Sequence, residues 1–146
     1  MKRQTDQLAR AVGAAIVDSE QRILLVQQAY GHCRWGLPGR HLGAGVHPAD
    51  AVVAEVLLEV GVESRVTGLV GLYRLTGGDD GLPDLLTYVL RCEVVAGAPV
   101  VNERGRITRV AWHSAAAVPP PITVTARAAA ADVAAGLVGV VRDLSR

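Results

Sequence analysis

The chain has 146 residues, which is enough for one domain built around one hydrophobic core. Half of its residues are apolar, but it has two Trp, three Tyr and no Phe, so aliphatic side chains and alanine must form that core. Its 15 basic and 14 acidic residues give a net charge of +1, which argues against a basic nucleic-acid-binding surface and against an acidic tail.

The cysteines and the absence of long apolar segments indicate a cytoplasmic setting. Cys33 and Cys92 are far apart and form neither a CxxC pair nor a disulfide framework, which is typical of a reducing compartment. The N-terminal segment lacks the apolar stretch of a signal peptide, and no apolar run is long enough to span a bilayer. We therefore expect a single cytoplasmic domain over residues 1–146, with a loose lead-in at residues 1–8 and no membrane partner.

Two short apolar runs near the N-terminus predict the first strands. Residues 11–17 and 23–26 are separated by a polar turn at residues 18–21, and this arrangement predicts a β-hairpin. A polar, glycine-containing loop follows at residues 30–36. The tripeptide Leu37-Pro38-Gly39 then marks a tight turn.

From Pro48 onwards the apolar residues recur with the period of a helix. Pro48 suits the first helical position, and Gly61 suits a left-handed cap at the C-terminal end. The apolar residues between them predict a mostly buried helix: Ala51, Val52, Ala54, Val56, Leu57, Leu58 and Val60.

The second half of the chain predicts three more strands and a closing helix. Residues 66–75 and 85–95 have the pattern of two long strands, joined by an exposed loop at residues 76–81. Residues 107–112 predict a short strand, and the alanine-rich residues 124–144 predict a helix. The order β-β-(β)-α-β-β-β-α predicts an α+β fold, an α-β-α sandwich with a mixed β-sheet between two helical layers.

Two carboxylates on the first predicted helix are candidates for a metal site. Glu55 and Glu59 are four residues apart, so they share one face of that helix. Like charges at this spacing repel each other, and a shared divalent cation would relieve the repulsion. The alternative is that both residues lie on a solvated helix face and have no chemical role.

The stretch from Trp35 to Val62 resembles the signature box of the Nudix superfamily. Residues 35–39, Trp-Gly-Leu-Pro-Gly, match the segment W-x-L-P-G-G that often precedes the box. The box reads G-x5-E-x7-R-E-U-x-E-E-x-G-U, where U is aliphatic, and this chain keeps Glu55, Val56, Glu59, Gly61 and Val62 of it. The resemblance covers nearly the whole chain. It implies a Nudix fold, with glutamates of a loop-helix-loop holding Mg²⁺ or Mn²⁺ against a diphosphate.

Four charged or flexible positions of the box are replaced, so the box is degenerate. The first glycine falls on Arg40, the first glutamate on Val46, the arginine on Ala54 and a later glutamate on Leu58. Many relatives also carry an acid near a late Trp-containing strand, where residues 103–109 are mainly basic here. Because a hard cation needs several oxygen ligands, the resemblance implies that binding of Mg²⁺ or Mn²⁺ by Glu55 and Glu59 is weakened.

Histidines offer a catalytic alternative that needs little or no metal. If the loop folds over the helix, His41 and His47 approach Glu55 and Glu59, and a His-carboxylate pair can act as a general acid or base. The same pair would also suit a softer ion such as zinc. The alternatives are ordinary surface histidines and, for His47, a cap at the start of the helix.

Substrate recognition is assigned to four further side chains. Arg40 and Arg109 suit bidentate contacts with an anion, and His32 and Tyr73 complete the predicted substrate-binding set. The alternatives are surface solubility for the arginines and sheet packing for the tyrosine. The expected partner is a small molecule rather than a nucleic acid. The small apolar faces of the last predicted helix also suit a homodimer contact.

Three functional hypotheses remain open. The first is a Nudix-fold enzyme of small-molecule metabolism with little or no metal dependence, which performs hydrolysis or a proton transfer such as isomerisation or cyclisation. The second is an ordinary Mg²⁺- or Mn²⁺-dependent hydrolase of a nucleoside diphosphate derivative. The third is a non-catalytic protein that binds a ligand or a partner.

Overall fold

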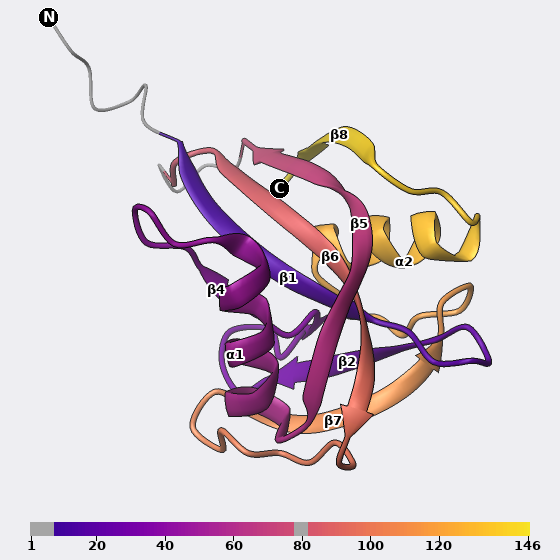
Figure 1. Cartoon of the computed structure of the whole chain (residues 1–146). Helices are drawn as coiled ribbons and strands as arrows, with labels where there is room; N and C mark the ends of the chain where they lie inside the picture. The colour runs from indigo at the N-terminus through magenta and orange to yellow at the C-terminus, as the bar shows by residue number, and fades with distance from the viewer. Residues whose placement is uncertain (1–7, 78–81) are drawn as a thin grey trace, which may run out of the picture.

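The computed structural model describes residues 8–77 and 82–146, which fold into two sheets and two helices (Figure 1). The elements are β1 (Ala9–Ile16), β2 (Arg22–Gln28), β3 (Trp35–Gly36), β4 (Gly39–His41), α1 (Pro48–Val60), β5 (Glu63–Thr76), β6 (Leu85–Ala96), β7 (Ile107–Ser114), α2 (Val124–Ala134) and β8 (Val140–Ser145). Neither helix is long and apolar enough to cross a membrane.

The larger sheet is mixed and lies between the two helices. Its strand order is β4-β1-β6-β5-β8, with β1 parallel to β6 and β5 antiparallel to β6. Successive residues of a strand point to opposite faces. Ala14 and Ile16 of β1 therefore belong to the core under α1, whereas Ala15 belongs to the core under α2. The predicted α+β fold, with a mixed sheet and a helix on each side, is confirmed.

The predicted hairpin of the first two strands is wrong. β1 and β2 lie in different sheets, and an isolated bridge between Val17 and Ile23 is what remains of the hairpin. β1 is buried on both faces, and it pairs in parallel with β6 from Ala9 to Ile16. A strand of this kind belongs in the middle of a sheet, where a distant segment provides its partner.

The closing helix is shorter than predicted, and a strand follows it. α2 ends at Ala134, and Gly136 and Gly139 then have positive φ angles of 72° and 64°. A left-handed backbone of this kind interrupts a helix and is favourable for glycine. Residues Val140–Ser145 form β8, which pairs in parallel with β5 at the edge of the sheet.

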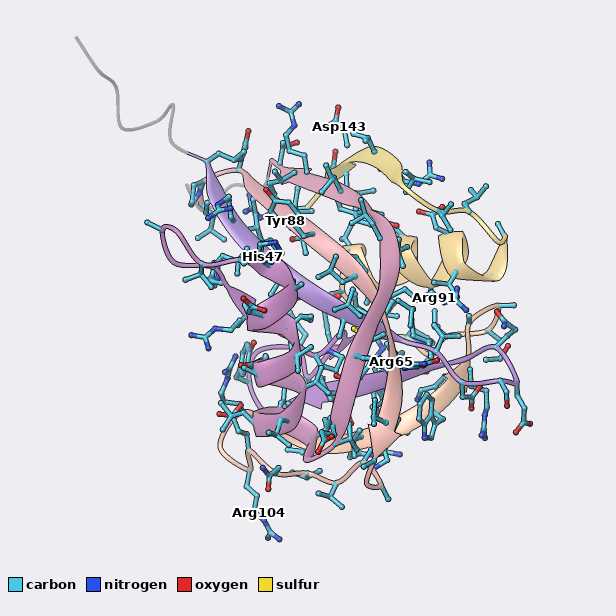
Figure 2. All side chains as sticks on the ribbon, viewed as in Figure 1. His47, Arg65, Tyr88, Arg91, Arg104 and Asp143 are labelled. Carbon is cyan, nitrogen blue, oxygen red and sulfur yellow. The ribbon has the colours of Figure 1, made fainter. Side chains whose placement is uncertain are left out.

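The first helix forms where the sequence predicts it, over Pro48–Val60. Pro48 occupies the first turn, and Gly61 caps the C-terminal end with a φ of 73°. His47 lies at the N-terminal end (Figure 2), where its Nδ1 accepts a hydrogen bond from the backbone N–H of Ala49 at 3.1 Å. The interpretation of His47 as a helix cap is confirmed.

A buried polar network fastens α2 to β5 and β8. The Tyr73 hydroxyl donates to Asp132 Oδ2 at 2.7 Å, and the Arg142 guanidinium donates to both Asp132 oxygens at 2.8 and 2.6 Å. Arg142 keeps the pKa of Asp132 below its ordinary value, while burial and Asp132 raise the pKa of Tyr73. Each polar group in this network therefore has a partner, as buried polar groups require.

Candidate functional site

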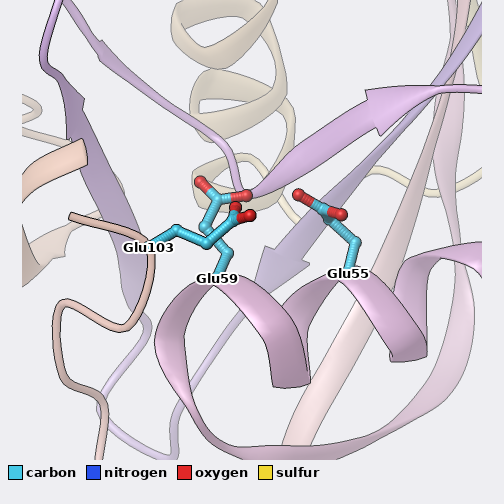
Figure 3. Close-up of side chains that lie close together, drawn as sticks. All are labelled: Glu55, Glu59 and Glu103. Carbon is cyan, nitrogen blue, oxygen red and sulfur yellow. The ribbon is translucent and has the colours of Figure 1, made fainter. Parts of the chain in front are cut away.

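Three carboxylates converge beside the last two turns of α1 (Figure 3). Glu55 and Glu59 come from α1, and Glu103 comes from the loop between β6 and β7. One oxygen from each lies within 4.8 Å of the others. Glu55 is 1% exposed and Glu59 is 4% exposed, so the alternative that these residues lie on a solvated helix face is wrong.

Glu103 reaches the cluster because the chain before it binds the C-terminal end of α1. The backbone N–H of Asn102 donates to Glu59 O at 3.1 Å, and the Asn102 side chain donates to Leu58 O at 2.8 Å. The last carbonyls of a helix have no partners within the helix, so a passing segment can satisfy them in this way. These bonds fix Glu103 next to the last turn of α1.

Two guanidinium groups lie at the border of the carboxylate cluster. Arg106 Nη1 is 3.6 Å from Glu55 Oε2 and 3.5 Å from Glu103 Oε1, and Arg40 Nη1 is 3.9 Å from Glu55 Oε1. About half of each arginine side chain is exposed, so solvent screens part of this attraction. The guanidinium groups therefore offset the negative charge of the cluster only in part.

The buried carboxylates are left short of hydrogen-bond partners. Among the described residues, Glu55 Oε2 and Glu59 Oε2 are buried and accept no hydrogen bond. Burial and the neighbouring Glu55 raise the pKa of Glu59 to about 8, against the opposing effects of Arg106 and the Gly39 backbone. A bound cation would favour the ionised form of Glu59, because its positive charge offsets both the cost of burying a carboxylate and the repulsion from Glu55. Three carboxylates with two unpartnered oxygens therefore fit a hard divalent cation, which prefers oxygen ligands.

Two cavities adjoin the cluster. The larger, of about 220 Å³, lies between β1, β4 and the start of α2, and Arg40, His41 and Arg106 line it. The smaller, of about 90 Å³, reaches Glu59, and Arg106 lines it as well. Gly39 allows β4 to approach β1 closely here, because a Cβ atom at this position would lie 2.5 Å from the Val12 carbonyl oxygen. Glu59 therefore borders the smaller cavity, and Arg106 connects the carboxylate cluster to the larger one, a cleft that a small molecule can enter.

Comparison with models of known protein families identifies the family of this chain. The NUDIX domain model matches residues 7–133 of the chain. The chain belongs to the NUDIX family. The resemblance to the Nudix superfamily is thereby confirmed, and it supports a small-molecule substrate.

Solved Nudix structures share the fold over most of the chain. A MutT NUDIX hydrolase from Burkholderia pseudomallei is 27% identical, with a TM-score of 0.80 over 88% of this chain and 99% of that one. A NUDIX hydrolase from Nitrosomonas europaea is 25% identical, with a TM-score of 0.74 over 91% and 93%. An ADP-ribose pyrophosphatase from Streptococcus suis is 22% identical, with a TM-score of 0.68 over 94% and 98%. Comparison with curated proteins found no significant match.

Part of the predicted Nudix site comes together in the structure. Glu55 and Glu59 lie in the carboxylate cluster, Arg40 contacts it, and His41 lines the larger cavity. His32 is exposed in the loop after β2 and lines neither of the two cavities beside the cluster. The catalytic role of His41 and the substrate-binding role of His32 stay predictions.

The catalytic role predicted for His47 is wrong. Its Nδ1 binds the start of α1, whereas Glu55 lies eight residues further along, roughly 12 Å at 1.5 Å per residue. His47 therefore caps the N-terminal end of α1 and does not contact the carboxylates.

The substrate-binding role predicted for Tyr73 also needs correction. Tyr73 is fully buried under α2 and its hydroxyl binds Asp132, so no substrate can reach it. The Arg109 guanidinium lies 5.2 Å from the centre of the Trp35 ring, and Arg109 lines neither cavity beside the cluster. Tyr73 therefore packs within the fold, whereas the substrate-binding role of Arg109 stays a prediction.

Sequence reasoning missed Glu103. The three arginines within residues 103–109 favour repulsion of cations, yet the one acid of this segment, Glu103, points into the cluster (Figure 3). The available signal was an acid just before the late Trp-containing strand, where many Nudix relatives carry one. By contrast Val46 and Leu58, at two glutamate positions of the box, are 42% and 49% exposed. Glu103 thus provides a third carboxylate from outside the box.

Proposed function

We propose that this Nudix protein hydrolyses the phosphoanhydride bond of a small diphosphate compound, with Mg²⁺ or Mn²⁺ held by Glu55, Glu59 and Glu103. The convergence of three carboxylates, two of them with unpartnered buried oxygens, is the observation that carries this proposal. It favours the metal-dependent hypothesis, because the loss of box glutamates is offset by Glu103. The ADP-ribose pyrophosphatase with the same fold is consistent with diphosphate chemistry.

The reaction adds water across the P–O–P bridge. The water oxygen bonds to one phosphorus, the bridging P–O bond breaks, and the proton ends on the phosphate that leaves. A bound divalent cation offsets phosphate charge and lowers the pKa of a bound water. In this chain, Arg40 and Arg106 border the cleft and offer guanidinium donors to phosphate oxygens. Glu55 and Glu59 are held in place by the buried face of α1.

The cleft favours a compact substrate. Its volume of about 220 Å³ lies below the range of roughly 300–1,000 Å³ that is common for ligand pockets. Thr87, Thr123 and Thr125 line it, together with Tyr30. Hydroxyl groups donate and accept hydrogen bonds, so the group attached to the diphosphate is small and polar.

A second candidate function is metal-independent proton transfer. The observation that favours it is the pKa of Glu59, which is raised to about 8 beside a cavity that this residue lines. A carboxylic acid that stays protonated near neutral pH can serve as a general acid. Isomerisation or cyclisation of a small metabolite would use such a group.

Turnover assays with and without a chelator separate these functions. The wild-type protein, Glu59→Gln and the control Glu63→Gln are assayed against inorganic pyrophosphate, sugar diphosphates and nucleoside diphosphate derivatives, with Mn²⁺ or with excess EDTA. Glu63 is exposed at the start of β5, so its substitution is a matched loss of charge outside the site. Metal-dependent turnover that Glu59→Gln loses and Glu63→Gln retains supports the proposal.

Two outcomes overturn it. Turnover that persists in excess EDTA and is lost in Glu59→Gln assigns the site to metal-independent chemistry. No turnover of any diphosphate with Mn²⁺, in a protein that still binds a diphosphate, leaves a non-catalytic binding protein.

A further inference from the structure

One guanidinium group bridges the carboxylate cluster and the open cleft. Arg106 Nη1 lies 3.6 Å from Glu55 Oε2 and 3.5 Å from Glu103 Oε1, so it contacts carboxylates from α1 and from the loop before β7. Arg106 also lines both cavities beside the cluster. Its backbone is fixed, because its carbonyl accepts a hydrogen bond from the N–H of Ala29 at 2.9 Å. The backbone of Arg106 is therefore held where its guanidinium can meet both a cation and an anionic substrate.

Arg106 and a divalent cation would use the same oxygens. Among the described residues, Glu55 Oε2 is one of the two buried carboxylate oxygens that accept no hydrogen bond, and Arg106 Nη1 is a cationic group near it that lies beyond hydrogen-bonding distance. A cation that binds Glu55 and Glu103 meets a positive charge within a few ångströms, and like charges at this range repel each other. In the free protein, Arg106 thus neutralises the cluster in part and opposes the entry of the metal.

An anionic substrate changes this balance. A guanidinium binds phosphate oxygens with two parallel hydrogen bonds, a stronger arrangement than a single long contact with a carboxylate. The Arg106 side chain is 53% exposed, so it has room to turn towards the cleft. Once it contacts the substrate, Glu55 and Glu103 are released, and the phosphate brings negative charge that attracts the cation further.

We propose that Arg106 is a positioning residue that couples metal binding to substrate binding. Its guanidinium holds Glu55 and Glu103 in the free protein and turns to the diphosphate when the substrate enters. This inference rests on the proposed function. Because coupling between two ligands is reciprocal, the diphosphate strengthens binding of the metal as much as the metal strengthens binding of the diphosphate.

Calorimetric titration with Mn²⁺ tests this coupling without any catalytic readout. Wild type, Arg106→Gln, Arg106→Lys and Arg104→Gln are titrated alone and with methylenediphosphonate, which cannot be hydrolysed, and the free Mn²⁺ concentration is corrected for its diphosphonate complex. Arg104 is exposed in the same loop and extends away from the body of the molecule (Figure 2). Arg104→Gln therefore removes the same charge two residues from Arg106 and serves as the matched control.

Arg106→Gln should bind Mn²⁺ alone about fivefold more tightly than wild type, because the competing charge is gone. The diphosphonate should strengthen Mn²⁺ binding about tenfold or more in wild type and in Arg104→Gln, and clearly less in Arg106→Gln. Direct contact between cation and diphosphonate contributes equally to all variants, so the difference between Arg106→Gln and Arg104→Gln measures the coupling through Arg106. Arg106→Lys keeps the positive charge and should therefore retain part of the coupling between Mn²⁺ and the diphosphonate. A merely structural role for Arg106 would not tighten Mn²⁺ binding.

Two results have different consequences. If Arg106→Gln binds Mn²⁺ no more tightly than wild type and keeps the full effect of the diphosphonate, the coupling through Arg106 is refuted while the metal site stands. If no variant binds Mn²⁺ with or without diphosphonate, the proposed function fails and the inference fails with it.

Discussion

Two buried polar clusters lie on opposite sides of the mixed sheet, and they differ in whether their carboxylate oxygens have hydrogen-bond partners. Under α2, Tyr73 and Arg142 give hydrogen bonds to both oxygens of Asp132, and its pKa is lowered. Under α1, Glu55 and Glu59 each keep a buried oxygen without a hydrogen bond, and the pKa of Glu59 is raised. Buried oxygens that have hydrogen-bond partners stabilise the fold. Buried oxygens without partners cost free energy, and a bound ligand such as a cation would offset that cost.

The fold can tolerate the unsatisfied cluster because the rest of α1 is well packed. Val52, Val56 and Val60 are fully buried in the core beneath the helix. Asn102 binds the C-terminal end of α1, so the helix stays in position without help from its carboxylates. The comparison therefore predicts that substitutions in one cluster change activity and substitutions in the other change stability.

The largest expected effect is on activity, from Glu103→Gln. We expect kcat/KM for the diphosphate substrate to fall about a hundredfold or more, because an ionised ligand of the cation is lost while the shape of the side chain is kept. Steady-state kinetics with Mn²⁺ measure this effect. The midpoint of urea unfolding in EDTA should stay close to that of wild type. Unchanged kinetics would mean that Glu55 and Glu59 act without a third carboxylate.

The next effect is on stability, from Asp132→Ala. This substitution leaves the buried Tyr73 hydroxyl without its partner, and we expect a loss of about 2 kcal/mol in the free energy of unfolding. Thermal unfolding should show a Tm lower by roughly 4 to 8 °C. The kcat of the folded protein should be close to that of wild type. A large loss of kcat at a temperature where the variant is folded would contradict the division between the two clusters.

The charge of Asp132 predicts a pH dependence of stability. Its pKa in the folded protein lies below the ordinary value of 3.8, chiefly because Arg142 binds the carboxylate. The stabilisation is fully present above that ordinary value, and it is lost as the pH falls through the folded-state pKa. Urea unfolding between about pH 5 and pH 3 should therefore show a steeper loss for wild type than for Asp132→Asn, which cannot ionise. If the free energy of unfolding fell equally with pH in both proteins, the ion pair between Asp132 and Arg142 would contribute nothing to the pH dependence of stability.

The smallest expected effect is from Asn102→Ala, which removes the hydrogen bond to Leu58 O. Loss of one such bond should lower the free energy of unfolding by about 1 kcal/mol. Because Asn102 also positions Glu103, Mn²⁺ binding should weaken as well. Calorimetry would measure this binding, with Asn102→Asp as the comparison. A variant that loses stability but keeps full Mn²⁺ affinity would show that the backbone alone positions Glu103.

The sequence predicts those parts of the molecule whose causes are local. Pro48 and Gly61 mark the ends of α1 because their backbone preferences act where they stand, and four-residue spacing places Glu55 and Glu59 on one face. The Nudix fold follows from the same stretch. The cap formed by His47 is local as well, because it lies directly before Pro48 and accepts a hydrogen bond from the N–H of Ala49.

The parts that the sequence did not predict depend on contacts between distant segments. β1 pairs with β6 rather than with β2, and β8 pairs with β5, and neither pairing leaves a turn signal between the partners. Glu103 joins the cluster through a bond between Asn102 and Leu58, which are 44 residues apart. A count of charges along the chain cannot show that the one acid in a basic segment points towards two buried glutamates.

The central claim is that the unsatisfied cluster holds a divalent cation. A crystal structure of the protein soaked with Mn²⁺, with anomalous scattering recorded for manganese, tests this claim most directly. The account predicts one anomalous peak bounded by carboxylate oxygens of Glu55, Glu59 and Glu103. No peak at these residues, with the three carboxylates in the positions described above, would contradict it.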